Sequence, residues 1–150
     1  MKCVDKAVAI VTRRNARTCE ILCFEHPIAG TQLPKGTVES GEEITAAVLR
    51  ELHEESGLKL NQMPEMFAEM KVEPTSQMSE QIWHFGLLNG DHEVRENWTH
   101  RPIGSPEEIG LEFSFFWKSV EDELKNSLCP VFERAFSIAC AHLRTGDINV

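Results

Sequence analysis

Long apolar runs are missing from this sequence of 150 residues. The longest apolar run near the N-terminus covers residues 7–11, which is too short to span a bilayer. Lys2, Asp5 and Lys6 lie just before this run, so the segment is not typical of a signal peptide either. We therefore expect a protein without a membrane span or a secretion signal.

Cysteine pairs of the metal-binding or redox type are also missing. The cysteines are odd in number and include no C-x-x-C pair; they are Cys3, Cys19, Cys23, Cys129 and Cys140. This pattern favours reduced thiols over a disulfide framework or a zinc site. We therefore expect a cytoplasmic protein.

Basic residues are scarce, because 15 Lys and Arg stand against 24 Asp and Glu and leave a formal net charge of −9. An acidic chain repels a phosphate backbone, so we expect no binding to duplex nucleic acid. The acids are unevenly spread. From Gly36 to Leu58, six glutamates and the single base Arg50 give 1 − 6 = −5 over 58 − 36 + 1 = 23 residues. Such runs are usually solvated surface, so charge alone assigns this segment no role.

The length and composition are typical of one globular domain, which we expect over residues 1–150. Short apolar or alternating runs predict strands near residues 7–11, 19–24, 66–73, 80–88 and 111–120. Proline and glycine predict a loop over residues 26–40. The polar stretch 89–110 predicts a long loop with one helical turn, and loops this long are often functional.

Two helices are predicted. Ser40 followed by Glu43 fits a capping box, so we expect a helix to begin there. It should end at Gly57 in the left-handed conformation, with Leu58 folding back. A second helix is predicted over residues 128–143, where apolar residues recur at helical spacing. Strands interleaved with two helices predict a compact α/β domain with a mixed sheet.

Three carboxylates share one face of the first helix. Glu51, Glu54 and Glu55 stand at positions i, i+3 and i+4. Their repulsion costs a few tenths of a kcal/mol per pair, roughly, unless a cation binds. Hard divalent cations such as Mg²⁺ or Mn²⁺ prefer oxygen ligands and suit this group. The core-facing stripe lies beside the acids, so the carboxylates should sit at the edge of the packed face; the stripe is Thr45, Val48, Leu49 and Leu52.

The spacing of these residues resembles a known motif. Gly36, five residues, Glu42, seven residues, Arg50-Glu51-Leu52, one residue, Glu54-Glu55, one residue and Gly57-Leu58 resemble the complete Nudix box. The resemblance implies a Nudix-type α/β/α sandwich with a mixed sheet between helices. It also implies a Mg²⁺-dependent hydrolase that acts on acid anhydrides in phosphorus-containing compounds, cleaving a nucleoside diphosphate linked to another moiety.

The resemblance also implies residue roles. Glu51, Glu54 and Glu55 would hold the metal, with the backbone carbonyl of Lys35 as a further ligand. Glu51 and Glu54 are also candidates for taking a proton. Arg50 would act with Glu42 as an orienting pair, in which Glu42 has a supporting role. Gly36 would let the loop approach the substrate phosphates closely.

The general base lies outside the box in many members of the family. The candidates here are Glu80, Glu93, Glu107, Glu108 and Glu112. Several relatives place a catalytic acid near the start of the last strand, which favours keeping Glu112 among them. The residues alone do not choose between these acids.

The residues around the box suggest a substrate. Pro34-Lys35-Gly36 and the residues after it resemble dinucleoside polyphosphate hydrolases, and Lys35 could bind phosphate as a point charge. Trp98 in the polar loop is a candidate for stacking on a nucleobase. Trp83 and Phe85 alternate on a predicted strand and are expected in the core. The first hypothesis is therefore a dinucleoside polyphosphate.

Several alternatives stay open. Removal of pyrophosphate from the 5′ end of RNA needs a basic groove, for which there is little beyond Arg13, Arg14 and Arg101. ADP-ribose and nucleoside triphosphates are further candidate substrates. A module that senses a nucleotide without turnover is a hypothesis of another class. A homo-oligomer is compatible with the sequence but cannot be derived from it.

Overall fold

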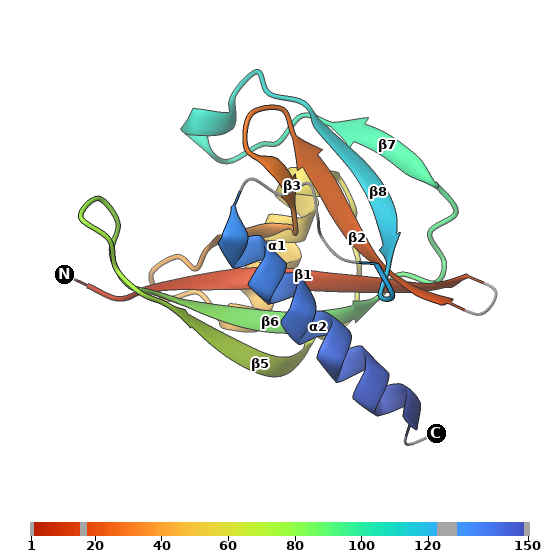
Figure 1. The fold of residues 1–150 in the computed structure, drawn as a ribbon. Coiled ribbons are helices and arrows are strands. Elements are labelled where there is room, and N and C mark those ends of the chain that lie inside the picture. Colours follow the sequence, from red (N-terminus) through yellow and green to blue (C-terminus); the bar gives the residue numbers. More distant parts are fainter. Residues whose placement is uncertain (1, 16–17, 123–128, 149–150) are drawn as a thin grey trace.

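The computed structural model describes residues 2–15, 18–122 and 129–148, with side chains to residue 144 (Figure 1). The strands are β1 (Val4–Asn15), β2 (Thr18–His26), β3 (Gly30–Gln32), β4 (Lys35–Thr37), β5 (Glu65–Val72), β6 (Gln81–Asn89), β7 (Asn97–His100) and β8 (Phe113–Ser119). The helices are α1 (Ile44–Ser56) and α2 (Pro130–Ile148), with a short 3-10 helix, η1 (Pro106–Glu108), before β8.

The strands form one mixed sheet in the order β5-β6-β1-β2-β8-β7, with β3 on β2 and β4 on β1. β1 runs parallel to β6, with Val8 beside Phe85, whereas its pairs with β2 and β4 are antiparallel. In Figure 1, β5 and β6 lie on one side of β1, and β2, β8 and β7 lie on the other. The expected mixed sheet of an α/β domain is confirmed.

The two helices cover opposite faces of the sheet, with α2 in front and α1 behind in Figure 1. Side chains of β1 alternate between the two resulting clusters. Val8 and Ile10 belong to the cluster under α2, whereas Ala7, Ala9 and Val11 belong to the cluster under α1. A strand buried on both faces is apolar without interruption, which explains the run over residues 7–11.

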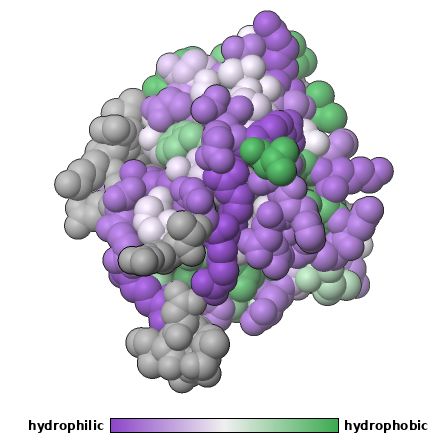
Figure 2. Space-filling view, turned by 90° about the vertical axis from the view of Figure 1, so that its right-hand side faces the viewer, coloured by the Kyte–Doolittle hydropathy of each residue, from purple (hydrophilic) through white to green (hydrophobic). Residues whose placement is uncertain are grey.

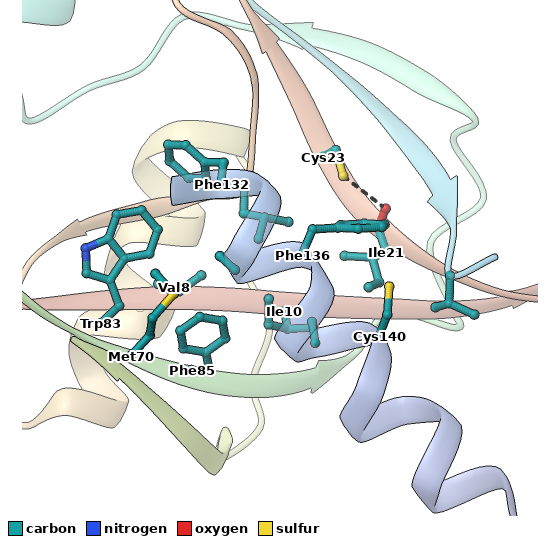
Figure 3. Packing of buried hydrophobic residues seen from close by; sticks show 14 of the residues in the cluster. Val8, Ile10, Ile21, Cys23, Met70, Trp83, Phe85, Phe132, Phe136 and Cys140 are labelled. Carbon is teal, nitrogen blue, oxygen red and sulfur yellow. Dashed lines mark hydrogen bonds between the residues drawn. The ribbon is translucent and has the colours of Figure 1, made fainter. Parts of the chain in front are cut away.

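The cluster under α2 is almost entirely apolar (Figure 3). Phe132 and Phe136 of the helix meet Trp83 and Phe85 of β6, and the Trp83 ring centroid lies 5.1 Å from that of Phe132. Trp83 and Phe85 are 2% and 0% exposed, so their expected place in the core is confirmed.

The predicted capping box at the start of α1 is wrong. The helix begins at Ile44 with Glu43 as N-cap, and no side chain caps it. The preceding residues form a tight turn instead, in which the Glu42 amide donates to the Glu39 carbonyl at 3.0 Å. The predicted end of the helix is confirmed, because Gly57 has φ 81° and Leu58 is buried.

Three short strands were not predicted. β3 and β4 lie in the expected loop 26–40, and β7 lies in the expected loop 89–110. Each has three or four residues and takes its hydrogen bonds from a longer neighbour, so it needs no alternating pattern of its own. η1 supplies the one helical turn expected in the second loop.

The second helix extends further than its apolar pattern. α2 runs from Pro130 to Ile148, five residues past the predicted end at Leu143. Its predicted start, Leu128, lies outside the described residues. The apolar positions mark only the part of the helix that packs on the sheet, so they did not predict its end.

The exterior differs from these clusters. The face in Figure 2 is mainly hydrophilic, and its hydrophobic groups form separate patches. Within the part of the chain that is described, neither helix is long and apolar enough to cross a membrane.

Candidate active site

A cleft of about 690 Å³ opens beside α1. Its wall combines the box residues of α1 and β4 with the β2–β3 hairpin and the segment around η1. The lining residues used below are Lys6, His26, Gln32, Lys35, Gly36, Arg50, Glu51, Glu55, Gly104, Glu107 and Glu108. Segments distant in sequence therefore meet at the predicted acidic face.

Arg50 holds most of the box carboxylates together. Its Nε and Nη2 donate to the two carboxylate oxygens of Glu42, at 2.7 and 2.9 Å. Its Nη1 donates to Glu51 at 2.7 Å and to Glu54 at 3.0 Å, and Nη2 also reaches the carbonyl of Thr37. The predicted pair of Arg50 and Glu42 thus forms as a two-point contact.

The contacts of Arg50 shift the protonation of its partners. The Arg50 hydrogen bond lowers the pKa of Glu42. Burial raises the pKa of Glu51, against the opposing effect of Arg50. The same guanidinium thus serves three carboxylates that are each only 14–16% exposed.

Glu55 occupies the most enclosed position of the acidic face. It is 6% exposed, and its Oε1 accepts the backbone N–H of Lys35 at 2.8 Å. Burial raises the pKa of Glu55 well above its ordinary value. The amide of Lys35 therefore contacts the acidic face directly, whereas a metal-ligand role for its carbonyl stays a prediction.

Gly36 lets β4 pass directly beside Glu51. A Cβ atom at residue 36 would lie 1.9 Å from the Glu51 Cδ, which is a severe overlap. The absence of a side chain is therefore needed to seat Glu51. The expected close approach to substrate phosphates is a separate prediction.

The last turn of α1 is closed by the C-cap Gly57 and by three donors from residues 98–103. A helix end leaves four carbonyls without helical partners. The Gly57 amide donates to His53, the Ile103 amide to Glu54, the His100 Nδ1 to Glu55 and the Trp98 Nε1 to Ser56, over 2.9–3.1 Å. Each of the four carbonyls therefore accepts a hydrogen bond, and these bonds fix the backbone of the turn that carries Glu54 and Glu55.

Trp98 has a structural position that the sequence did not indicate. Its ring stacks on Phe115 at 5.3 Å, and the Arg95 guanidinium lies 4.3 Å from the ring centroid. With its N–H on Ser56, the half-buried Trp98 links β7 to α1. The residue is not part of the cleft wall, so stacking on a base stays a prediction that its position does not favour.

Two lysines line the cleft. The Lys35 ammonium packs on rings of the cluster under α2, 4.7 Å from the Trp83 ring centroid and 5.3 Å from that of Phe132, and burial lowers its pKa, so its role in binding phosphate stays a prediction. The Lys6 Nζ donates to the Thr37 Oγ1 at 2.7 Å. Sequence reasoning missed Lys6, because only its register opposite Thr37 of β4 brings it to the box.

The out-of-box acids separate clearly by position. Glu107 and Glu108 line the cleft, and burial raises the pKa of Glu108, with the charge of Glu51 adding to the effect. Glu107 accepts a hydrogen bond from Ser105 instead. Glu112 is exposed and is not part of the cleft wall, so position favours Glu108 over Glu112.

The ligand atoms of the acidic face suit a hard cation, but the side chains are not positioned around a common point where a cation could bind. Its donors are carboxylate oxygens, which Mg²⁺ and Mn²⁺ prefer. In the described ranges, however, no three His, Cys, Asp or Glu side chains are grouped to hold an ion. Arg50 explains this, because its Nη1 lies between Glu51 and Glu54. A cation would have to replace these contacts.

Similar folds occur among solved structures. The MutT NUDIX hydrolase from Burkholderia pseudomallei aligns with a TM-score of 0.67 and 20% identity, over 91% of this chain and 98% of that one. The NUDIX domain of Shewanella oneidensis NrtR, solved with ADP ribose, aligns with a TM-score of 0.67 and 15% identity, over 97% and 90%. A Caenorhabditis elegans Ap4A hydrolase aligns with a TM-score of 0.62 and 20% identity, over 93% and 98%. At these identities the likeness concerns the fold.

The sequence itself identifies the family. No curated protein matches the chain significantly. The family model described as the NUDIX domain matches residues 4–132, which cover most of the chain and contain the whole box. This membership supports a hydrolase acting on phosphorus-containing anhydrides. The chain belongs to the Nudix family.

Proposed function

We propose that this protein is a divalent-cation-dependent pyrophosphohydrolase that cleaves a nucleoside diphosphate linked to another group. The observation that carries the proposal is the shared cleft, where Glu51 and Glu55 meet Lys6 and Glu108. A cation-binding acidic face next to positive charge suits a polyphosphate, which needs both. We also propose that residues 1–150 form one domain and that the protein is cytoplasmic.

Three glutamates of the box, Glu51, Glu54 and Glu55, would hold the cation, with the carbonyl of Lys35 as a further ligand. Mg²⁺ is the first candidate and Mn²⁺ the second. When bound, the cation would neutralise phosphate charge and make a water more acidic. Arg50 would keep its two contacts to Glu42 if its Nη1 left the other carboxylates, and it would then position the carboxylates of the box.

Glu108 is our candidate for the group that takes the proton from the attacking water. It is an out-of-box carboxylate on the cleft wall, on the segment that faces the box residues. Glu107 is its neighbour in the same 3-10 helix and is bonded to Ser105. The adjacent pair offers a matched test.

Glu108→Gln should lower kcat by about a hundredfold or more, because a lost general base costs roughly that much. Glu107→Gln should change kcat by no more than about twofold. The measurement is Mg²⁺-dependent phosphate release over a range of pH, in which Glu108→Gln also loses the acidic limb of the rate profile. Equal rates in the two variants would exclude Glu108 as the base.

A dinucleoside polyphosphate is the first candidate substrate. The fold is similar to that of an Ap4A hydrolase, and the entry to the box resembles such enzymes. ADP-ribose is the second candidate, because the similar NrtR domain was solved with it. Nucleoside triphosphates remain a further alternative.

RNA is less favoured as a substrate. It would need a basic groove for the trailing strand. Of the arginines that might form one, Arg13 is 5% exposed and is bonded to Glu20 and Glu96. That guanidinium is therefore engaged within the protein.

A substrate panel tests the proposal. Phosphate or nucleotide release is measured with Mg²⁺ over dinucleoside polyphosphates, ADP-ribose, nucleoside triphosphates and capped or triphosphorylated RNA. We expect turnover of a dinucleoside polyphosphate. Binding of a nucleotide without turnover of any compound would instead support the sensing module and overturn the enzyme proposal.

A further inference from the structure

Glu54 differs in position from the other two glutamates of the acidic face. Glu51 and Glu55 line the cleft, whereas Glu54 is not part of the cleft wall. Its side chain is 16% exposed, and its two carboxylate oxygens lie 3.0 and 3.4 Å from the Arg50 Nη1. The groups around this carboxylate therefore decide whether it reaches a cation at the acidic face.

The segment between β7 and β8 contacts Glu54 at two points. The Ile103 amide donates to the Glu54 carbonyl at 3.1 Å. Gly104 is the next residue, and it lines the cleft. A Cβ atom at residue 104 would lie 2.7 Å from the Glu54 Cδ, which is a severe overlap. The missing side chain of Gly104 therefore leaves the space that the Glu54 carboxylate occupies.

The backbone of this segment has little freedom to withdraw from Glu54. Pro102 is buried, and the proline rings at 102 and 106 fix φ on both sides of Gly104. The hydrogen bond of the Ile103 amide also ties the segment to the end of α1. The glutamate side chain, in contrast, has several rotatable bonds. An added side chain at residue 104 would therefore displace the Glu54 carboxylate and leave the segment in place.

The same arrangement occurs on the other side of the acidic face. Gly36 of β4 leaves room for Glu51, as Gly104 does for Glu54. Glu51 and Glu54 share the Nη1 of Arg50, so each of two neighbouring carboxylates has a glycine from a different segment beside it. Changes to residues that orient a metal ligand typically cost 10–100-fold in metal affinity. The spacing of the two carboxylates thus depends on both glycines.

We propose that Gly104 is a positioning residue, which keeps the Glu54 carboxylate at the acidic face as a ligand for the cation. It acts through Glu54 and contacts neither the cation nor the substrate. The inference rests on the proposed function, since that function assigns Glu54 to the cation. Its test uses binding of the metal alone, which does not depend on turnover.

Gly104→Ala adds the smallest side chain at this position. Because Gly104 has φ 90°, alanine also introduces strain in the left-handed region. Gly110 of the same segment offers a matched control. It has φ 87°, and apart from its chain neighbours a Cβ atom there would meet no atom of the described residues within 4 Å. Gly110→Ala therefore introduces similar strain without the overlap.

Titration with Mn²⁺, followed by electron paramagnetic resonance of the free ion, measures the Kd for the metal. Gly104→Ala should weaken Mn²⁺ binding about tenfold or more, as expected when a ligand loses its orientation. Gly110→Ala should change the Kd by no more than about twofold, although urea denaturation should show similar losses of stability in the two variants. Equal Mn²⁺ affinities in the two folded variants, or a wild type that binds no Mn²⁺, would overturn the inference.

The Glu54→Gln background tests whether Gly104 acts through Glu54. Glu54→Gln removes the charge at nearly constant size, so the position of this side chain should no longer affect the metal. Adding Gly104→Ala to Glu54→Gln should then change the Kd no more than adding Gly110→Ala does. A further tenfold loss in the double variant would show that Gly104 acts through another group and would overturn the inference.

A second pair of variants guards against misfolding. Gly104→Asn and Gly110→Asn place a Cβ atom at the same positions, and asparagine adopts the left-handed conformation more readily than alanine. The same difference in Mn²⁺ affinity is expected between them. An affinity that depends on Gly104 would support the inference even if the substrate panel gave no turnover, which would overturn only the proposed function. Turnover with equal affinities would overturn only the inference.

Discussion

Arg13 and Arg50 both form ion pairs with carboxylates, but the charge and solvation of the groups around them differ. Arg13 on β1 donates to the carbonyls of Glu93 and Arg95 and to the carboxylates of Glu20 and Glu96, and its guanidinium lies 4.3 Å from the Trp117 ring centroid.

Arg50 on α1 donates mainly to carboxylates. Glu42, Glu51 and Glu54 share it, each 14–16% exposed, and Glu39 lies 3.5 Å away. One of the two carboxylates around Arg13, Glu96, is 72% exposed and solvated.

The difference lies in the net charge of the poorly solvated groups around each arginine. Around Arg13, neutral carbonyls and a ring use much of the guanidinium, and Glu20, 15% exposed, is the one poorly solvated carboxylate among the two that it contacts. Around Arg50, three poorly solvated negative charges face one positive charge. The first arrangement is complete as it stands, whereas the second carries a surplus that favours a further cation. The comparison teaches that the surplus of negative charge, more than the number of ion pairs, distinguishes the candidate functional cluster.

The largest expected effect comes from removing the structural arginine. Arg13→Met removes the buried partner of the poorly solvated Glu20, and we expect a loss of about 3–5 kcal/mol in the free energy of unfolding. Urea denaturation measures this change. Turnover per folded molecule should stay within about twofold, since Arg13 is not part of the cleft wall. An Arg13→Met protein that is as stable as the wild type but has lost turnover would contradict this assignment of Arg13 to stability.

The next effect comes from the surplus charge around Arg50. Glu54→Gln keeps size and removes one negative charge, so metal-dependent turnover should fall at least about a hundredfold. The folded state should be as stable as the wild type or more so, because repulsion decreases. Glu43→Gln is the matched control, because Glu43 is the exposed N-cap of the same helix and its side chain makes no capping hydrogen bond. Wild-type turnover in Glu54→Gln would disprove the metal-site assignment.

The smallest effect concerns an ion pair outside the cleft. Arg95 holds the pKa of Glu93 below its ordinary value through a hydrogen bond of 2.6 Å. The folded state thus binds a proton on Glu93 less readily than the unfolded chain. The resulting stabilisation is present above the ordinary pKa and is lost as the pH falls through the lowered one.

Glu93→Gln should therefore cost about 1 kcal/mol or less at pH 7, because Arg95 is half exposed. In unfolding measurements the difference from the wild type should shrink as the pH falls below the ordinary pKa of a glutamate, and it should vanish once the pH is below the lowered pKa of Glu93. Turnover should not change. A large loss of turnover would instead return Glu93 to the candidates for the general base.

The acidic part of the site could be predicted from the sequence because its chemistry is local. Glu51, Glu54 and Glu55 lie within two turns of one helix, where spacing alone fixes a common face. The apolar run over residues 7–11 and the left-handed Gly57 have equally local causes. The start of α1 was missed because the Glu39–Glu42 turn and the Arg50 contact compete with a capping box.

The rest of the cleft depends on pairing between distant segments. Lys6 reaches the box through its register with β4, and Gln32 reaches the side of His26 through its register with β2. No spacing along the chain reports such contacts. The role of Trp98 at the end of α1 was hidden for the same reason, because the tryptophan and its acceptor are 42 residues apart.

The closed end of α1 has a consequence for ligand affinity. Helix ends whose carbonyls lack partners tend to fray, and ordering them on binding costs conformational entropy. Here donors from residues 98–103 have already ordered the turn that carries Glu54 and Glu55. Binding of the proposed cation would therefore require a change of side-chain partners and no ordering of backbone. Residues 98–103 would contribute to the affinity of the site in this way, although they lie outside the acidic box.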